Sequence, residues 1–159
     1  MGYDVTRADL HTISDDLDYL YAQGEWSAWG VWVHSWTDVT LGDGNSKGRY
    51  CEINDLVLFM AELIFGTTTS VSGVVSLNYP ATAANVYTAG FMLGKAALID
   101  ASTSFTYVGD LSFTNTTGAG LRYHAVGGTN IYTAPVDATV PFTWANADKM
   151  LVQGFYEKA

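Results

Sequence analysis

The stretch Leu56-Val-Leu-Phe-Met-Ala-Glu-Leu-Ile-Phe65 decides the fold, because it is apolar on both faces of an extended strand. Ten residues are about half the length that a helix needs to cross a bilayer, and Glu62 interrupts the run. Turn residues bound it, with Asn54 and Asp55 before it and Gly66 after it. Such a run is typical of a central strand covered on both sides, and it predicts a β-sheet domain.

Further short strands are predicted on either side of this run, separated by turn signals. Gly42-Asp43-Gly44-Asn45 precedes a strand at 47–53, and Pro80 ends a strand at 74–79 because proline cannot donate to a ladder. The other predicted strands are a Trp-rich region at 26–36 and residues 91–93, 96–100, 105–113, 121–126, 131–133, 142–144 and 150–156. We therefore expect a mostly β chain, with one antiparallel β-sandwich or jelly-roll-like domain over residues 26–159.

Residues 1–25 follow a different pattern and are predicted to form a short amphipathic, acidic α-helix over 5–21. Thr6 is suited to the N-cap position and Gly24 to the end of the helix. The apolar residues repeat at spacings of three, four and three, as in a coiled coil, at Leu10, Ile13, Leu17 and Leu20. A helix with fewer than three heptads is marginal alone, so it must pack on something.

The charges of this segment leave two interpretations open. Six Asp or Glu against Arg7 give residues 1–25 a charge of −5, out of −9 for the chain. Asp9 and Asp16 fall at heptad position g, and no Lys or Arg stands at e to pair with them. Either the segment packs on its own β-domain or on two symmetry-related copies, or it anchors the protein in a groove on a basic partner. The candidate contact residues are Leu10, Ile13, Leu17, Leu20, Asp9 and Asp16.

The composition restricts the classes of partner. Charged residues make up only 14% of the chain and apolar residues 48%, so neighbouring subunits are expected to cover part of the surface. Sixteen acidic against seven basic residues disfavour nucleic acid and anionic membranes as partners. No signal-peptide pattern is present, so we expect a soluble protein made in the cytoplasm. Cys51, the only cysteine, is expected to be a small buried hydrophobe.

The titratable residues form no recognisable catalytic or metal-binding motif. His11, His34 and His124 are isolated from one another, and no Gly-x-Ser-x-Gly elbow occurs. Glu62 is expected at a strand edge in water, paired with Arg49 or Arg122, or functional. The other acidic residues of the domain are expected at turns, namely Asp43, Asp55, Asp100, Asp110, Asp137 and Asp148. We expect no cofactor, no metal and no enzymatic activity.

Several segments of the β-domain share a pattern with known proteins. They are Leu41-Gly-Asp-Gly-Asn-Ser-Lys-Gly-Arg-Tyr50, Ile64-Phe-Gly-Thr-Thr-Thr-Ser-Val-Ser-Gly73, Val74-Val-Ser-Leu-Asn-Tyr-Pro80 and the ending from Val140 to Glu157. This pattern resembles a β-domain of virion structural proteins of tailed phages that infect actinobacteria, where it occurs in head-decoration proteins and in minor tail or fibre proteins. The resemblance covers residues 36–159 and implies a homotrimer of jelly-roll-like domains, with no catalytic residues to carry over.

The resemblance implies a non-enzymatic protein on the outer surface of a virion. Because only some 25 residues precede the domain, a minor capsid or head-fibre protein that decorates the capsid fits better than a tail fibre. Its partners would be itself, as a homotrimer, and the major capsid protein, held through the N-terminal segment. The alternative is a receptor- or glycan-binding module of a tail fibre, with host-surface glycan as its partner. An enzyme such as a glycan hydrolase ranks third.

Overall fold

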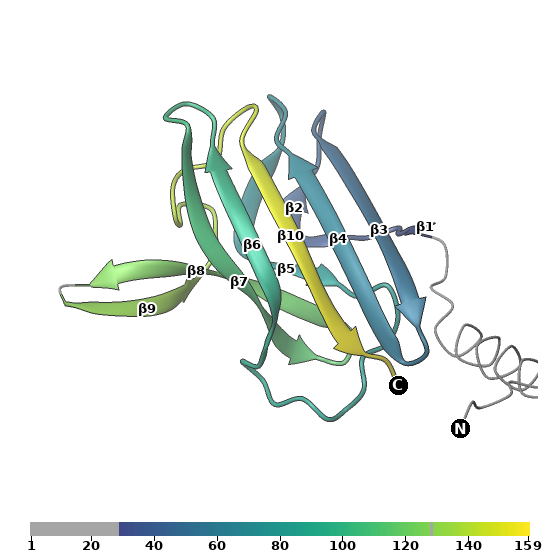
Figure 1. Cartoon of the computed structure of the whole chain (residues 1–159). Coiled ribbons are helices and arrows are strands. Elements are labelled where there is room, and N and C mark those ends of the chain that lie inside the picture. The colour runs from purple at the N-terminus through teal and green to yellow at the C-terminus, as the bar shows by residue number, and fades with distance from the viewer. Residues whose placement is uncertain (1–28, 128) are drawn as a thin grey trace, which may run out of the picture.

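A computed structural model describes residues 29–127 and 129–159, which form one curled sheet of antiparallel strands (Figure 1). Its ten strands are β1 (Gly30–Val31), β2 (Trp36–Thr40), β3 (Asn45–Ile53), β4 (Leu56–Ile64), β5 (Ser70–Asn78), β6 (Met92–Asp100), β7 (Phe105–Asn115), β8 (Gly118–Gly127), β9 (Asn130–Pro135) and β10 (Lys149–Glu157). Their order in space is β1-β3-β4-β10-β6-β7-β8-β5-β2, and β9 pairs with β8. The mostly β, antiparallel prediction is confirmed, whereas the predicted helix within residues 1–25 lies outside the described residues.

The core lies inside the curl, because alternate residues of each strand point to opposite faces. In β4, Val57, Phe59 and Leu63 are at most 2% exposed. Leu58, Met60 and Ile64 point to the outer face and are partly exposed. Only one face of β4 is therefore covered by described residues, although the sequence predicted a strand covered on both. The outer face of this sheet is left partly apolar.

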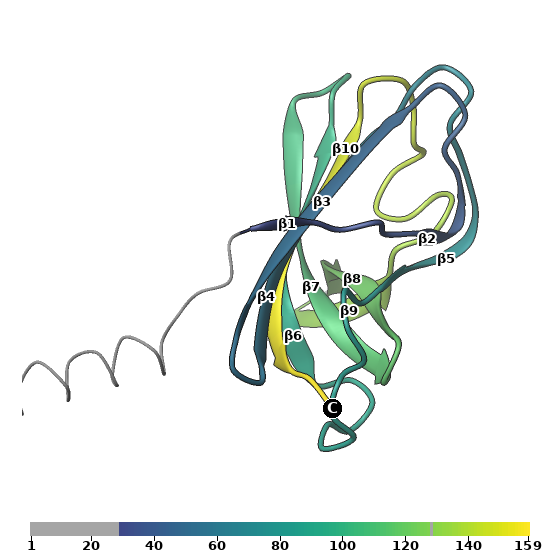
Figure 2. The same cartoon turned by 90° about the vertical axis from the view of Figure 1, so that its right-hand side faces the viewer.

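One run of chain joins the two edges of the sheet. β1 pairs with β3 at one edge and β2 pairs with β5 at the other, and residues 32–35 connect them across one side of the curl (Figure 2). We call residues 30–40 the closing segment. Trp32 and Trp36 are 4% and 9% exposed, and the Trp32 ring meets Phe59 edge-on at 5.5 Å between centroids. The single strand predicted at 26–36 was wrong, because the chain must leave one edge before it can pair with the other.

The hydroxyl of Ser46 in β3 fastens the closing segment. It accepts the indole N–H of Trp36 at 2.8 Å and lies 2.6 Å from Nε2 of His34. Nδ1 of His34 lies 3.1 Å from the carbonyl oxygen of Trp32. A carbonyl only accepts, so Nδ1 of His34 is the donor to Trp32, and the Ser46 hydroxyl itself donates to the carbonyl of Glu62 at 3.2 Å. The closing segment is therefore tied to β3 by side chains where no strand pairing holds it.

Two further predictions of strand boundaries were wrong. Gly94 and Lys95 were expected to separate two strands, but β6 runs through them. Gly94 stands opposite Gly154 of β10, and a Cβ at Gly94 would collide with the backbone carbonyl of Gln153. The glycine thus permits a close approach of backbones, next to the shift of register between β6 and β7. Residues 142–144 form no strand; the Trp144 ring in this region stacks on Phe65 at 4.8 Å.

Replacing Trp32 should weaken the packing of the closing segment on the core. Trp32→Ala is expected to lower the free energy of unfolding by about 3–5 kcal/mol, because it leaves a cavity in the core. The neighbouring Val33 is 91% exposed, so Val33→Ala should change the free energy of unfolding by less than about 0.5 kcal/mol. Urea denaturation of both variants measures the difference. Similar small losses for the two variants would contradict this role of Trp32.

Adding one methyl group at Gly94 should strain the contact between β6 and β10. Gly94→Ala is expected to lower the free energy of unfolding by about 1–3 kcal/mol, because the backbones must separate. Gly120→Ala in β8 is the matched control, since its Cβ would meet only the hydroxyl oxygens of Thr114 at 3.2 Å and Ser112 at 3.6 Å. These side chains can turn aside. Equal stability of both variants in thermal unfolding would refute the close-approach argument.

Candidate functional site

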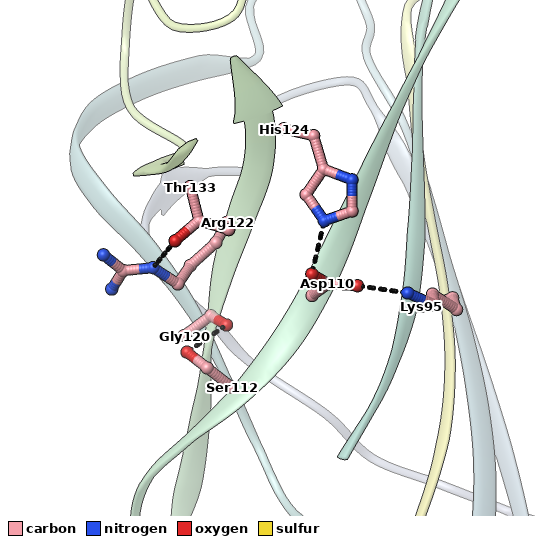
Figure 3. A network of polar contacts seen from close by, with 7 residues as sticks. All are labelled: Lys95, Asp110, Ser112, Gly120, Arg122, His124 and Thr133. Atoms are coloured by element: carbon pink, nitrogen blue, oxygen red, sulfur yellow. Dashed lines mark hydrogen bonds and ion pairs between the residues drawn. The ribbon is translucent and has the colours of Figure 1, made fainter. Parts of the chain in front are cut away.

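A polar cluster centred on Asp110 lies on the outer face of β6, β7 and β8 (Figure 3). Oδ1 of Asp110 is 2.6 Å from Nζ of Lys95, and Oδ2 is 2.5 Å from Nε2 of His124. Asp110 is only 2% exposed, although its strand position points to the outer face. The expectation that Asp110 stands at a turn was wrong, because it lies in β7 opposite Lys95 and Arg122.

The cluster stabilises the charged form of Asp110. Burial alone would raise the pKa of this carboxyl, but the hydrogen bonds from Lys95 and His124 outweigh burial and hold the pKa below its usual range. Because the carboxylate only accepts, Nε2 of His124 is the donor to it. Asp110 is therefore a carboxylate held between two donors from neighbouring strands.

The geometry gives this cluster a structural role in joining strands. Ser112 follows two residues along β7, but its Oγ donates to the carbonyl of Gly120 at 3.3 Å. Figure 3 places Ser112 on the opposite side of Asp110 from His124. The Asp110–His124 pair thus does not form a nucleophilic triad with Ser112. Instead, the cluster ties β6, β7 and β8 together where β8 begins to leave the body of the sheet.

Beyond this cluster, β8 and β9 project from the body as a two-stranded arm (Figure 1). We define the arm as residues 123–134, with Gly128 left aside. Val126 and Ile131 are each 75% exposed, and Tyr132 is 52% exposed. At the foot of the arm, Nε of Arg122 donates to the hydroxyl of Thr133 at 3.4 Å. A two-stranded ribbon is marginal alone in water, so apolar side chains at this place indicate a contact surface.

A hollow of about 770 Å³ lies on the outer face of β3, β4 and β10. The outward side chains around it are Lys47, Arg49, Met60, Glu62, Leu151 and Gln153. Glu62 stands opposite Lys47 and Leu151, within a central strand of the sheet. The prediction of Glu62 at a strand edge was therefore wrong, and no ion pair joins it to Arg49 or Arg122 in the described part of the chain.

The Trp side chains of the described residues are engaged by other parts of the domain. Trp32 and Trp36 are buried, and Trp144 stacks on Phe65. Trp29 is 44% exposed, and its ring centroid lies 5.1 Å from the Arg49 guanidinium carbon. Of these four residues, Trp29 thus has the most exposed ring, and the other three pack within the domain.

The turn expectation is confirmed for Asp43 and fits Asp148, which directly follows a turn. Asp43 accepts from Thr67 and Thr68, and these hydrogen bonds hold its pKa well below the usual range. Asp148 is 1% exposed and accepts the backbone N–H groups of Ala101 and Ala145. Both carboxylates fasten loops to the body of the domain.

The candidate contact residues taken from the sequence, Leu10, Ile13, Leu17, Leu20, Asp9 and Asp16, lie outside the described residues. Over residues 29–127 and 129–159, no group of three or more His, Cys, Asp or Glu side chains is placed to hold a metal ion. The same residues include no helix that is long and apolar enough to span a membrane. Neither a family model, nor a curated protein, nor a solved structure matches the chain.

Removing the charge of Asp110 should weaken the sheet at the foot of the arm. Asp110→Asn is expected to lower the free energy of unfolding by about 1–3 kcal/mol at neutral pH, because both donors lose a carboxylate. Glu62→Gln, which removes a carboxylate from the same outer face, is the control and should have little effect. Urea denaturation measures both.

Comparison of the wild type with Asp110→Asn at different pH values tests the lowered pKa of Asp110. A folded-state pKa below the unfolded one stabilises the fold above the usual carboxyl pKa of about 4, and this stabilisation is lost as the pH falls through the folded value. The difference in free energy of unfolding between wild type and Asp110→Asn should therefore shrink as the pH falls below the usual carboxyl pKa. A difference in free energy of unfolding that grows on acidification would contradict a lowered pKa of Asp110.

Proposed function

We propose that the protein is a non-enzymatic virion structural protein of a tailed phage. Its jelly-roll-like β-domain forms a homotrimer that decorates the outer surface of the capsid. The observation that carries the assembly role is the arm, whose apolar residues Val126 and Ile131 are each 75% exposed. The placement on a virion rests on the resemblance of residues 36–159 to phage head-decoration and fibre domains.

The arm is suited to contact a neighbouring copy. It carries unpaired backbone groups along the free edge of β9 and apolar side chains beyond the core. Such an edge is usually shielded or paired, because it otherwise invites uncontrolled strand addition. In a closed trimer each copy would offer one arm and receive one, so that every arm is covered.

The rest of the outer face supports the same proposal. Phe155 and Val108, both on the outer face, are 62% and 54% exposed. Apolar surface of this extent on a chain with only 14% charged residues favours burial between subunits. Attachment to the major capsid protein is assigned to the N-terminal segment, through the apolar stripe of Leu10, Ile13, Leu17 and Leu20.

Sedimentation equilibrium tests the trimer and the arm together. The full chain should sediment as a trimer at micromolar concentration, and the double exchange Val126→Asp with Ile131→Asp should shift it to the monomer. Val86→Asp is the matched control, because Val86 is 67% exposed but lies between β5 and β6, away from the arm. A monomeric wild type would contradict the trimer, and an arm variant that stays trimeric would contradict the role of the arm.

Electron cryomicroscopy of the particle that carries the protein tests the placement. Density for the β-domain is expected at three-fold or quasi-three-fold positions of the capsid. Density at the tail tip would instead favour the receptor-binding alternative.

A further inference from the structure

The hollow on the outer face matches the N-terminal segment in position, charge and apolar character. We propose that residues 1–25 dock on this hollow in the same chain while the protein is free. This docking belongs to the unattached protein, whichever particle the protein later joins.

The side chains around the hollow form two rows across three strands. Lys47, Glu62 and Leu151 stand in register across β3, β4 and β10, and Arg49, Met60 and Gln153 form the next row. Met60 in β4 and Leu151 in β10, two adjacent inner strands of the sheet, are partly exposed and supply apolar surface. Lys47 and Arg49 supply positive charge along one side. The surface thus offers two apolar side chains and the Glu62 carboxylate beside a basic flank.

The positive charge of the chain is concentrated on this outer face. Of the seven Lys and Arg residues, five project from it, at Lys47, Arg49, Lys95, Arg122 and Lys149. Lys158 is paired with Glu52, and Arg7 belongs to the N-terminal segment. The segment carries six acidic residues and a charge of −5. Because Lys95 pairs with Asp110, the cations placed to complement the acidic segment at the hollow are Lys47 and Arg49.

The chain enters the described part of the domain at the rim of the hollow. Trp29 lies over the Arg49 guanidinium, and Val31, which lines the hollow, stands opposite Arg49. The residues between Leu20 and Trp29 can span roughly 25–30 Å when extended. Crossing from β3 to β10 requires only about 10 Å, at about 4.8 Å for each strand. The segment can therefore return over the hollow of its own chain.

Connection within one chain favours the segment over a separate partner. A short linker gives an effective concentration in the millimolar range, so even weak docking is populated. Docking would cover the apolar stripe of Leu10, Ile13, Leu17 and Leu20 before attachment. On attachment to a capsid, the apolar stripe would leave the hollow and contact the major capsid protein instead.

Paramagnetic relaxation enhancement in the full-length protein tests the docking. A nitroxide is placed at Ser14→Cys in a Cys51→Ser background, since Cys51 is the only natural cysteine. Amide signals of residues 47–49, 60–62 and 151–153 should lose most of their intensity, while those of the arm keep theirs. Loss confined to other strands, or no loss at all, overturns the proposal.

A mixed sample separates docking in one chain from exchange between copies. Spin-labelled protein without isotope is mixed with ¹⁵N-labelled protein that carries no nitroxide. The ¹⁵N signals around the hollow should be unaffected, and broadening in this sample would overturn docking within one chain. Neither experiment depends on capsid placement, so its failure is distinct from failure of the proposed function.

Charge variants test the complementarity. The double exchange Lys47→Glu with Arg49→Glu should weaken docking and restore the intensity of the amide signals around the hollow. Arg122→Glu, on the same face at β8, is the control and should leave these signals broadened. Asp15→Asn, Asp16→Asn and Asp18→Asn together should also weaken the broadening without altering the folded domain. Broadening that survives both sets of changes overturns the electrostatic part of the proposal.

Discussion

The closing segment is the constraint on which the rest of the structure depends. The curled sheet has two edges, and this one run of chain pairs with both, through β1 at β3 and β2 at β5. Between the two pairings it places Trp32 and Trp36 in the core and fastens them through Ser46. Without this contact, both edges would be open and Phe59 on the inner face of β4 would lose the ring of Trp32. Side chains of the closing segment, which has little strand pairing, therefore close the core of the domain.

Because closure uses the inner faces of the strands, the outer face is available for other tasks. It carries the Asp110 cluster, the hollow over β3, β4 and β10, and the foot of the arm. The hollow and the foot of the arm each carry an excess of basic residues in a chain that is acidic overall, through Lys47 and Arg49 at the hollow and Arg122 at the arm. The sheet thus separates a core that provides stability from a surface suited to assembly.

The sequence predicts a strand well where turn residues bound an apolar run, as at Leu56–Ile64. The closing segment could not be predicted, because its Trp residues contact β3 and the core only after the curl has formed. Asp110 was assigned to a turn from its residue type. The turn between Asp100 and Phe105 joins β6 and β7 into a hairpin, and counting back from it places Lys95 opposite Asp110. This register is the sequence signal that could have revealed the cluster. The contacts of residues 1–25 stay a prediction.

Hydrogen exchange at the backbone amide of Trp32 tests the central claim most directly. This amide donates to the carbonyl of Gly48 at 3.0 Å, between the two strand pairings of the closing segment. If closure and core form one cooperative unit, it should exchange with the same free energy of opening as the amides between β4 and β10. Exchange of the Trp32 amide at nearly the unprotected rate, while the β4–β10 amides stay protected, would contradict the claim.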